Sequence, residues 1–176
     1  TRLPGILNAP WKLNSDRNGI IGGEWNTALM KEAAKLIVRT LPQLRTDEDP
    51  ARLLDAFPRQ LERIDEDAST LIEAVLEQLE TAAVIPDANG NLRSASELWQ
   101  YPRNNAKLAQ QWMVIADEAT RSELIHPLCL ERQRDSRIKK IADRLDAKSN
   151  EQHNLHQVSA EKWFSLIASI EKEKAA

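Results

Sequence analysis

Apolar residues recur every three or four positions in several stretches of this chain, a spacing typical of helices with one buried face. The clearest stretch follows Asp65, Glu66 and Asp67, three acidic residues that suit the positive end of a helix dipole. Its apolar positions are Ala68, Leu71, Ile72, Val75, Leu76, Leu79 and Ala83. We predict an amphipathic helix here.

A second helical pattern begins near Glu24 and ends at Pro42. Its apolar positions are Trp25, Leu29, Ala33, Leu36, Ile37 and Leu41. Because Trp25 belongs to this stripe, we expect its side chain to pack in the core, and the same holds for Trp163 in a last helix capped by Ser159. The remaining residues of that last stripe are Leu166, Ile167 and Ile170.

The segments around these helices predict shorter elements. Asp49 as N-cap and Pro50 at the first helical position indicate a short helix that ends at Pro58. Its expected buried residues are Leu53, Leu54 and Phe57. Residues 132–145 carry a further helical stripe, made of Ile138, Ile141, Ala142 and Leu145.

Two segments predict β structure. Residues 84–93 read as a hairpin, because Asn89 and Gly90 form a turn pair that tolerates positive φ. Ser94 then caps a helical turn that carries Glu97. Residues 5–9 predict a short strand ended by Pro10. The fold class is therefore mainly α with minor β, an α+β arrangement of amphipathic helices, one N-terminal strand and one small hairpin.

Charge divides the chain into three regions. Residues 1–46, with the strand, a basic loop and the first helix, carry a net charge of +4. Residues 47–102 hold an acidic helical pair and the hairpin, and the part from 47 to 82 alone carries −8. Residues 103–176 form a C-terminal helical region. We expect one compact unit, and a chain that begins at Thr1 without Met suggests a piece of a longer protein.

The overall composition narrows the class of protein. The chain of 176 residues is 41% hydrophobic and 29% charged, with a net charge of −3, which suits a globular domain. The near-neutral balance argues against a dedicated nucleic-acid or anionic-membrane binder. No apolar run approaches the roughly 20 residues that span a bilayer. We therefore expect a cytoplasmic protein that does not bind a membrane.

The sequence holds no self-contained active site. It lacks a Walker loop, a Rossmann glycine triplet, a His-Glu-x-x-His motif and a Gly-x-Ser-x-Gly motif. Cys129 lies between leucines and reads as a small buried hydrophobe. His153 and His156 lie in a polar linker with no third ligand nearby. We predict no catalytic group, bound cofactor or metal site of the chain's own, and hence no enzyme activity for the isolated chain.

The most informative segment is a basic loop between the first strand and the first helix. Lys12 and Arg17 lie on it, in the run Trp11-Lys12-Leu13-Asn14-Ser15-Asp16-Arg17. Such a loop can bring a cation to a phosphate held by a neighbouring domain. The residues alone favour a simpler interpretation, in which both cations are solvated or Arg17 pairs with Asp16 or Glu24.

A family resemblance supports the phosphate interpretation. The run from Leu3 to Arg17, followed by Glu24-Trp25-Asn26-Thr27-Ala28-Leu29, resembles a segment of sacsin-type proteins. A second run, from Ile85 to Leu98, is similar to a recurring "Pro, turn, Leu-Arg, x, x, Ser-Glu-Leu" element of the same family. Sacsin-type proteins carry an ATP-binding domain of the Hsp90, gyrase and histidine-kinase (GHKL) superfold, and this segment lies just downstream of it. The two runs cover the first hundred residues, and residues 101–176 match nothing.

The resemblance implies a non-catalytic coupling segment of a chaperone-like ATP-binding protein. It implies ATP and Mg²⁺ in the neighbouring domain of the same chain, and a bacterial genome-defence role for the parent protein. Lys12 and Arg17 become candidates to contact a phosphate in trans. The nucleotide-binding motifs themselves are absent from these residues, so the parent protein and not this segment is the candidate ATPase.

Two alternatives stay open. The chain could be a helical protein-interaction module unrelated to an ATPase, with Trp11 and Trp99 as candidate interface residues, because tryptophans outside a core stripe favour interfaces. It could also bind nucleic acid through a basic helix over residues 132–148. The candidate cations of that helix are Arg132, Arg134, Arg137, Lys139, Lys140 and Arg144. No base-reading motif accompanies them, so nucleic acid is the least expected partner.

Overall fold

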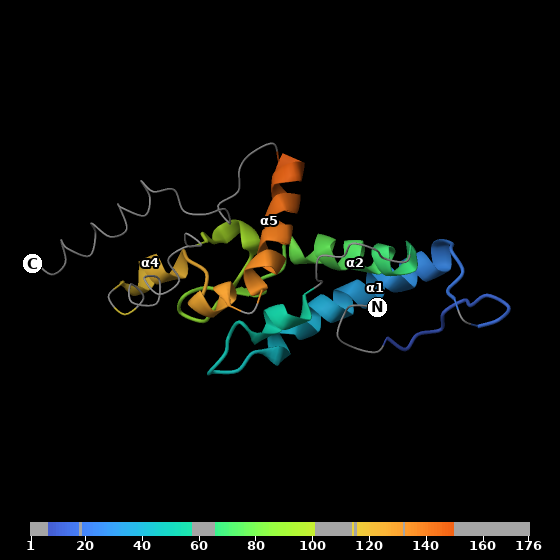
Figure 1. Cartoon of the computed structure of the whole chain (residues 1–176), viewed down its shortest axis with the longest axis horizontal. Coiled ribbons are helices and arrows are strands. Elements are labelled where there is room, and N and C mark those ends of the chain that lie inside the picture. The colour runs from blue at the N-terminus through green and yellow to red at the C-terminus, as the bar shows by residue number, and fades with distance from the viewer. Residues whose placement is uncertain are drawn as a thin grey trace, which may run out of the picture.

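The computed structural model describes residues 7–17, 19–57, 66–100, 114, 116–131 and 133–149. The described chain is mainly α with minor β, as predicted. Two helices, α1 (Glu24–Thr40) and α2 (Glu66–Leu79), lie side by side along the long dimension of the molecule and begin at the same end (Figure 1). The C-terminal elements gather at the opposite end.

Helix α1 begins and ends where the sequence predicts, but its buried face is only partly the predicted one. Leu41 is buried, and Ala33 and Ile37 pack against the core, as predicted. The buried residues of the helix are Asn26, Met30, Ala34 and Val38. Trp25 and Leu36 are 49% and 57% exposed, so the prediction that Trp25 packs in the core is wrong. Apolar residues cover more of the circumference of α1 than α2 can bury. The polar Asn26 is buried because its amide group is fully hydrogen-bonded to the backbone of Lys12 and Ile21.

Helix α2 confirms the strongest sequence pattern as far as Leu79, but the helix ends there, so the predicted position Ala83 lies beyond it and is exposed. Its buried apolar residues are Leu71, Ile72, Ala74, Val75, Leu76 and Leu79. These residues form one stripe at helical spacing, and this stripe packs along α1. The α1–α2 pair is therefore the long axis on which the remaining elements are placed.

The connection after α1 contains two 3-10 helices, η1 (Leu41–Leu44) and η2 (Arg52–Ala56). Leu53, Leu54 and Phe57 are buried, as predicted. The N-cap position of η2 is Ala51 and not the predicted Asp49, whose carboxylate binds Arg134 of a distant helix. Pro58 lies outside the described residues.

The predicted hairpin is present as β1 (Ile85–Pro86) and β2 (Leu92–Arg93), which pair in antiparallel fashion. In its turn only Gly90 has a positive φ, of 85°, whereas the sequence allowed it for Asn89 as well. Gly90 N–H donates to the Asp87 carbonyl at 2.9 Å, which makes a type I turn followed by a left-handed glycine. The fully buried Asp87 carboxylate accepts the backbone N–H groups of Asn89 and Asn91 and holds this turn closed.

Beyond the hairpin the chain forms η3 (Ala95–Glu97), α4 (Glu118–Ser122) and η5 (Pro127–Leu130). The Glu97 carboxylate accepts hydrogen bonds from the hydroxyl and backbone N–H of Ser94, which confirms the predicted cap and lowers the pKa of Glu97. The Trp99 N–H donates to the Glu123 carbonyl and the Trp99 carbonyl accepts the Ile125 N–H, and this parallel bridge attaches the chain after η3 to the segment after α4.

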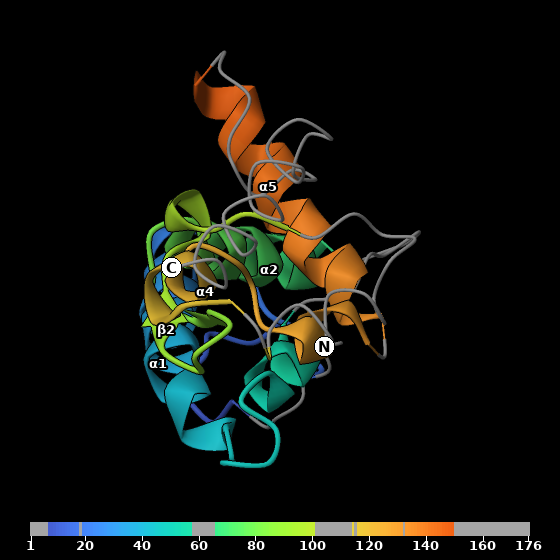
Figure 2. The same ribbon diagram turned by 90° about the vertical axis from the view of Figure 1, so that its left-hand side faces the viewer.

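Helix α5 (Arg134–Ser149) crosses this end of the molecule and projects away from it (Figure 2). Ile138, Ile141 and Ala142 are buried, as the stripe predicts. The helix is also held by arginine side chains, of which Arg134 is 1% exposed and Arg144 binds Glu73 and Glu80 of the α2 region. Two kinds of contact, apolar and ionic, therefore attach α5 to the rest of the described chain.

The N-terminal segment differs from the prediction. Residues 7–9 are not in a strand, and residues 5 and 6 lie outside the described part. Trp11 N–H donates to the Ala9 carbonyl at 2.7 Å, a tight turn that a continuing strand could not make. The chain pairs instead a few residues later, through a bridge between Leu13 and Ile20.

His126 predicts a pH dependence of stability. Burial lowers the pKa of this imidazole below 6.5, and the nearby Asp49, Asp87 and Glu131 oppose that shift only in part. Its Nδ1 accepts the Leu128 N–H at 3.3 Å, which requires the neutral ring. The unfolded chain therefore binds a proton more readily, so the free energy of unfolding falls as the pH drops below about 6.5.

Urea unfolding at about pH 7.5 and about pH 5.5 would measure this effect. In the variant His126→Asn, whose amide oxygen can accept the same N–H, we expect a smaller loss between the two pH values. An equal loss in both proteins would assign the pH dependence to carboxylates instead.

Candidate functional site: a basic hairpin at the start of α1

The two cations singled out by the sequence lie on a small hairpin, residues 12–21, of which residue 18 is not described. Ile21 N–H donates to the Lys12 carbonyl at 2.9 Å, and Asn14 N–H donates to the Gly19 carbonyl at 3.0 Å. Arg17 lies at the tip, where its backbone has a φ of 57° and its N–H donates to the Asn14 carbonyl. We call residues 12–21 the basic hairpin.

Asn26 fixes the base of the basic hairpin to α1. Its Oδ1 accepts the Lys12 N–H at 2.9 Å, and its Nδ2 donates to the carbonyl oxygens of Lys12 and Ile21 at 2.8 and 2.6 Å. The side chain is only 3% exposed in the surrounding structure. Three short hydrogen bonds to both strands of the hairpin thus set its direction relative to the helix.

Trp25 provides a second attachment. Its indole Nε1 donates to the Pro10 carbonyl at 3.0 Å, and the Lys12 ammonium lies 5.6 Å from the centre of the indole ring. The ammonium is therefore engaged in a cation–π contact with an exposed ring, a contact worth about 0.5–1 kcal/mol. Lys12 is exposed, but its ammonium already contacts the Trp25 ring.

Arg17 differs from Lys12 in this respect. Its side chain is exposed, and no described residue forms an ion pair with it. The local pairs expected with Asp16 or Glu24 are not formed; the Asp16 carboxylate accepts from Ser15 instead. The structure thus separates the two candidates, with Lys12 at the base and Arg17 at the tip of the basic hairpin.

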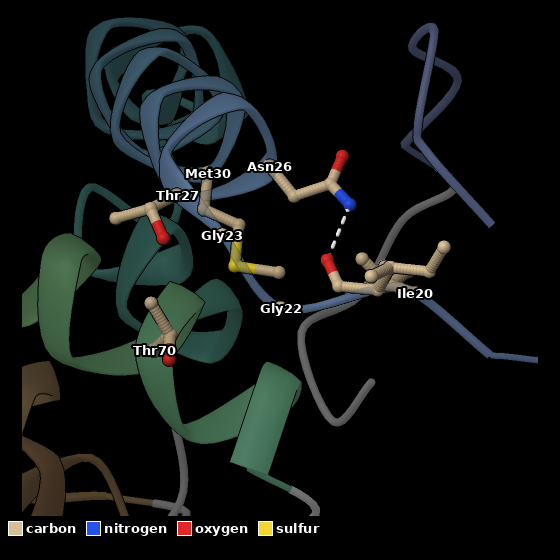
Figure 3. A pocket seen from close by; sticks show the side chains of 8 residues that line it. Ile20, Gly22, Gly23, Asn26, Thr27, Met30 and Thr70 are labelled. Atoms are coloured by element: carbon tan, nitrogen blue, oxygen red, sulfur yellow. Dashed lines mark hydrogen bonds between the residues drawn. The ribbon is translucent and has the colours of Figure 1, made fainter. Parts of the chain in front are cut away.

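A pocket of about 360 Å³ lies behind the basic hairpin, between the first turns of α1 and α2. Figure 3 shows Thr70 of α2 facing Met30 and Thr27 of α1 across it, with Gly22 and Ile20 on the hairpin side. Its lining is mixed, and no group of metal-binding side chains is found among the described residues. The pocket separates the hairpin from α2, so the hairpin is supported by α1.

The other tryptophans singled out in the sequence, Trp11 and Trp99, are less exposed than Trp25. Trp11 and Trp99 are both partly buried and pack against the core. Trp25, which was expected in the core, is the more exposed side chain. Trp163 lies outside the described residues, as do His153 and His156.

The expected basic face of residues 132–148 is not displayed as one surface. Arg134 and Arg137 are buried, where they bind the carboxylates and carbonyl groups of the 49–57 segment. Arg144 binds Glu73 and Glu80. Lys139 and Lys140 remain as cations without a described partner, and Arg132 is not described. Three of the cations proposed to contact phosphate therefore form ion pairs within the chain.

Cys129 is fully buried, as predicted, and burial raises the pKa of its thiol well above the ordinary value. It therefore stays protonated and has no character of a nucleophile. No helix in the described part of the chain has the length and apolar character needed to cross a membrane.

Comparisons with known proteins returned nothing: no family model, no curated protein and no solved structure matches this chain. The candidate site therefore rests on the chemistry and geometry of its residues. Sequence reasoning identified Lys12 and Arg17 but missed the role of Asn26. The apolar residues Leu13, Ile20 and Ile21 on either side of a polar, glycine-containing turn were the available signal for a hairpin.

Proposed function

We propose that this chain is a non-catalytic coupling segment of a larger sacsin/Hsp90-like ATP-binding protein. In this proposal Arg17 reaches a phosphate group held by a neighbouring domain of the same protein. The observation that supports it best is an exposed guanidinium without a described partner at the tip of a hairpin fixed to α1. A guanidinium held this way can offset the charge that develops during phosphoryl transfer.

The attachment of the basic hairpin supports a coupling role as well. A force on Arg17 passes through the Asn26 hydrogen bonds to α1, and α1 packs along α2. The end of α2 is joined to α5 by Arg144, which binds Glu73 and Glu80. This series of contacts leads from the hairpin tip to the helix that projects at the other end of the molecule.

The test is ATP turnover of the intact parent protein. We expect Arg17→Ala to lower turnover about 100- to 1,000-fold, the range seen when one donor to a developing negative charge is removed. Lys12→Ala should have a smaller effect, because this ammonium already lies over Trp25. Lys31→Ala, an exposed cation of α1, is the matched control and should leave turnover unchanged.

Unchanged turnover in both the Arg17 and Lys12 variants would remove the phosphate role. The isolated 176-residue chain should show no heat of ATP binding by calorimetry. Measurable binding by the isolated chain would mean that the nucleotide site lies here and not in a neighbour.

A helical protein-interaction module is the second candidate function. The exposed Trp25 and Leu36 on one side of α1 favour it. The proposal does not require a nucleic-acid partner.

A further inference from the structure

Lys12 is held at its backbone and at its side chain by two consecutive residues of α1. Asn26 accepts the Lys12 N–H and donates to the Lys12 carbonyl, so this part of the backbone has a fixed position relative to the helix. Trp25 holds the side chain, since the ammonium lies 5.6 Å from the centre of the indole ring. The ring is itself fixed, because its Nε1 donates to the Pro10 carbonyl at 3.0 Å. A flexible lysine side chain is therefore directed by a fixed aromatic surface.

The contact with Trp25 leaves the charge of Lys12 uncancelled. A carboxylate at this position would also hold the ammonium, but the pair would carry no net charge. An indole ring attracts a cation through its quadrupole and has no charge of its own. Among the described residues no carboxylate forms an ion pair with Lys12, and this includes the exposed Glu24, which directly precedes Trp25. The ring thus fixes the ammonium and preserves its charge.

The exposure of both groups indicates that this charge acts outside the chain. Trp25 is 49% exposed and Lys12 is exposed, and a cation–π contact at such a site adds little to stability. Residues 12–21 carry two basic side chains and one acidic one. The acidic one, Asp16, accepts a hydrogen bond from the Ser15 hydroxyl. The basic hairpin therefore presents a net positive charge, which attracts an anion.

We propose that Trp25 is a positioning residue, which holds the Lys12 ammonium in a charged state to bind the phosphates of the nucleotide in the neighbouring domain. This inference rests on the proposed function and gives its two cations different roles. Arg17 at the hairpin tip offsets charge that develops during phosphoryl transfer, so its loss lowers kcat. Lys12 at the base attracts phosphate charge that is present before and during the reaction. Its loss therefore raises KM and leaves kcat nearly unchanged.

Steady-state kinetics of the intact parent protein test these roles. Lys12→Met removes the charge and should raise the KM for ATP about tenfold, with kcat changed by no more than about twofold. Trp25→Glu still holds the ammonium but cancels its charge, so KM should rise by a similar factor. Trp25→Phe keeps an aromatic ring and should change KM by no more than about twofold. Gln43→Glu, the control, adds the same charge at an exposed position of η1 and should change neither constant.

A double variant shows whether Trp25→Glu acts through Lys12. In the Lys12→Met background it should raise KM little further, whereas direct repulsion of ATP by the new carboxylate would add its full effect and overturn the inference. An equal KM for Trp25→Glu and Trp25→Phe would overturn it as well, because the charge would then have no role.

The position of the Lys12 side chain is measured separately, by NMR of the 176-residue chain without nucleotide. The protons next to the ammonium should be shifted upfield by the indole ring current, and the shift should be lost in Trp25→Glu. The same spectra verify that each variant keeps its fold. No such shift in the original chain would overturn the positioning role. A normal kcat for Arg17→Ala beside a raised KM for Lys12→Met would refute the transfer role of Arg17 but support this inference.

Discussion

Replacing Arg134 by methionine is expected to lower the free energy of unfolding by about 3 kcal/mol, which urea denaturation at neutral pH would measure. All five N–H donors of this guanidinium form hydrogen bonds. Nε and Nη2 donate to Asp55 at 3.0 and 2.7 Å, and Nη1 and Nη2 donate to Asp49 at 2.9 and 2.8 Å. Nη1 also donates to the Leu128 carbonyl at 3.3 Å. The hydrogen bonds that Arg134 donates to Asp55, and those it donates to Asp49, raise the pKa of Arg134 further, so it remains charged.

The free energy of unfolding falls because the substitution removes the partner of the Asp49 and Asp55 carboxylates. Without the guanidinium, two carboxylates face each other beside buried apolar side chains. Asp55 is 40% and Asp49 22% exposed, so solvent screens part of their repulsion and keeps the effect at the lower end of the range for buried pairs.

Lys139→Met is the matched control, since it removes an exposed cation from the same helix and should change stability by no more than about 0.5 kcal/mol. Adding Asp49→Asn and Asp55→Asn to the Arg134 variant should recover part of the loss. A loss below about 1 kcal/mol for Arg134→Met would mean that the cluster is held open to solvent and contributes as a surface pair does.

Patterns that depend on neighbours in sequence were predicted correctly. The α2 stripe, the hairpin around Gly90 and the Ser94 cap each depend on residues within one or two turns of one another. The Arg134 cluster could not be predicted in this way, because its carboxylates are 79 and 85 positions away along the chain. From the sequence Arg134 read as part of an exposed basic helix, and only the position of α5 shows that it is buried.

Helix α1 shows a different limit. Its boundaries followed from Glu24 and Pro42, but the wide apolar surface of the helix allows more than one buried face. The structure selects the face that contains Asn26, which a hydrophobic pattern excludes from the core. Polar residues enter a core when their hydrogen bonds are satisfied, and the partners of Asn26 come from a loop whose path the sequence does not specify.

Replacing that residue is the second change with a large expected effect. Asn26→Leu keeps the side chain close in size but leaves the Lys12 N–H and the carbonyl groups of Lys12 and Ile21 without their partner, at an expected cost of about 2 kcal/mol. Because these bonds attach the basic hairpin to α1, we also expect hydrogen exchange at the Lys12 and Ile21 amides to accelerate well beyond the global change in stability.

The same variant separates a positioning role from a purely structural one. In the intact parent protein Asn26→Leu should lower ATP turnover about as much as Arg17→Ala, and combining the two should add little, since both act through the guanidinium at the hairpin tip. Gln43→Ala, which removes an exposed amide from η1, is the control and should change neither exchange nor turnover. Fast exchange at the hairpin with normal turnover would show that Arg17 does not need the attachment to α1, and the coupling route through Asn26 would then be wrong.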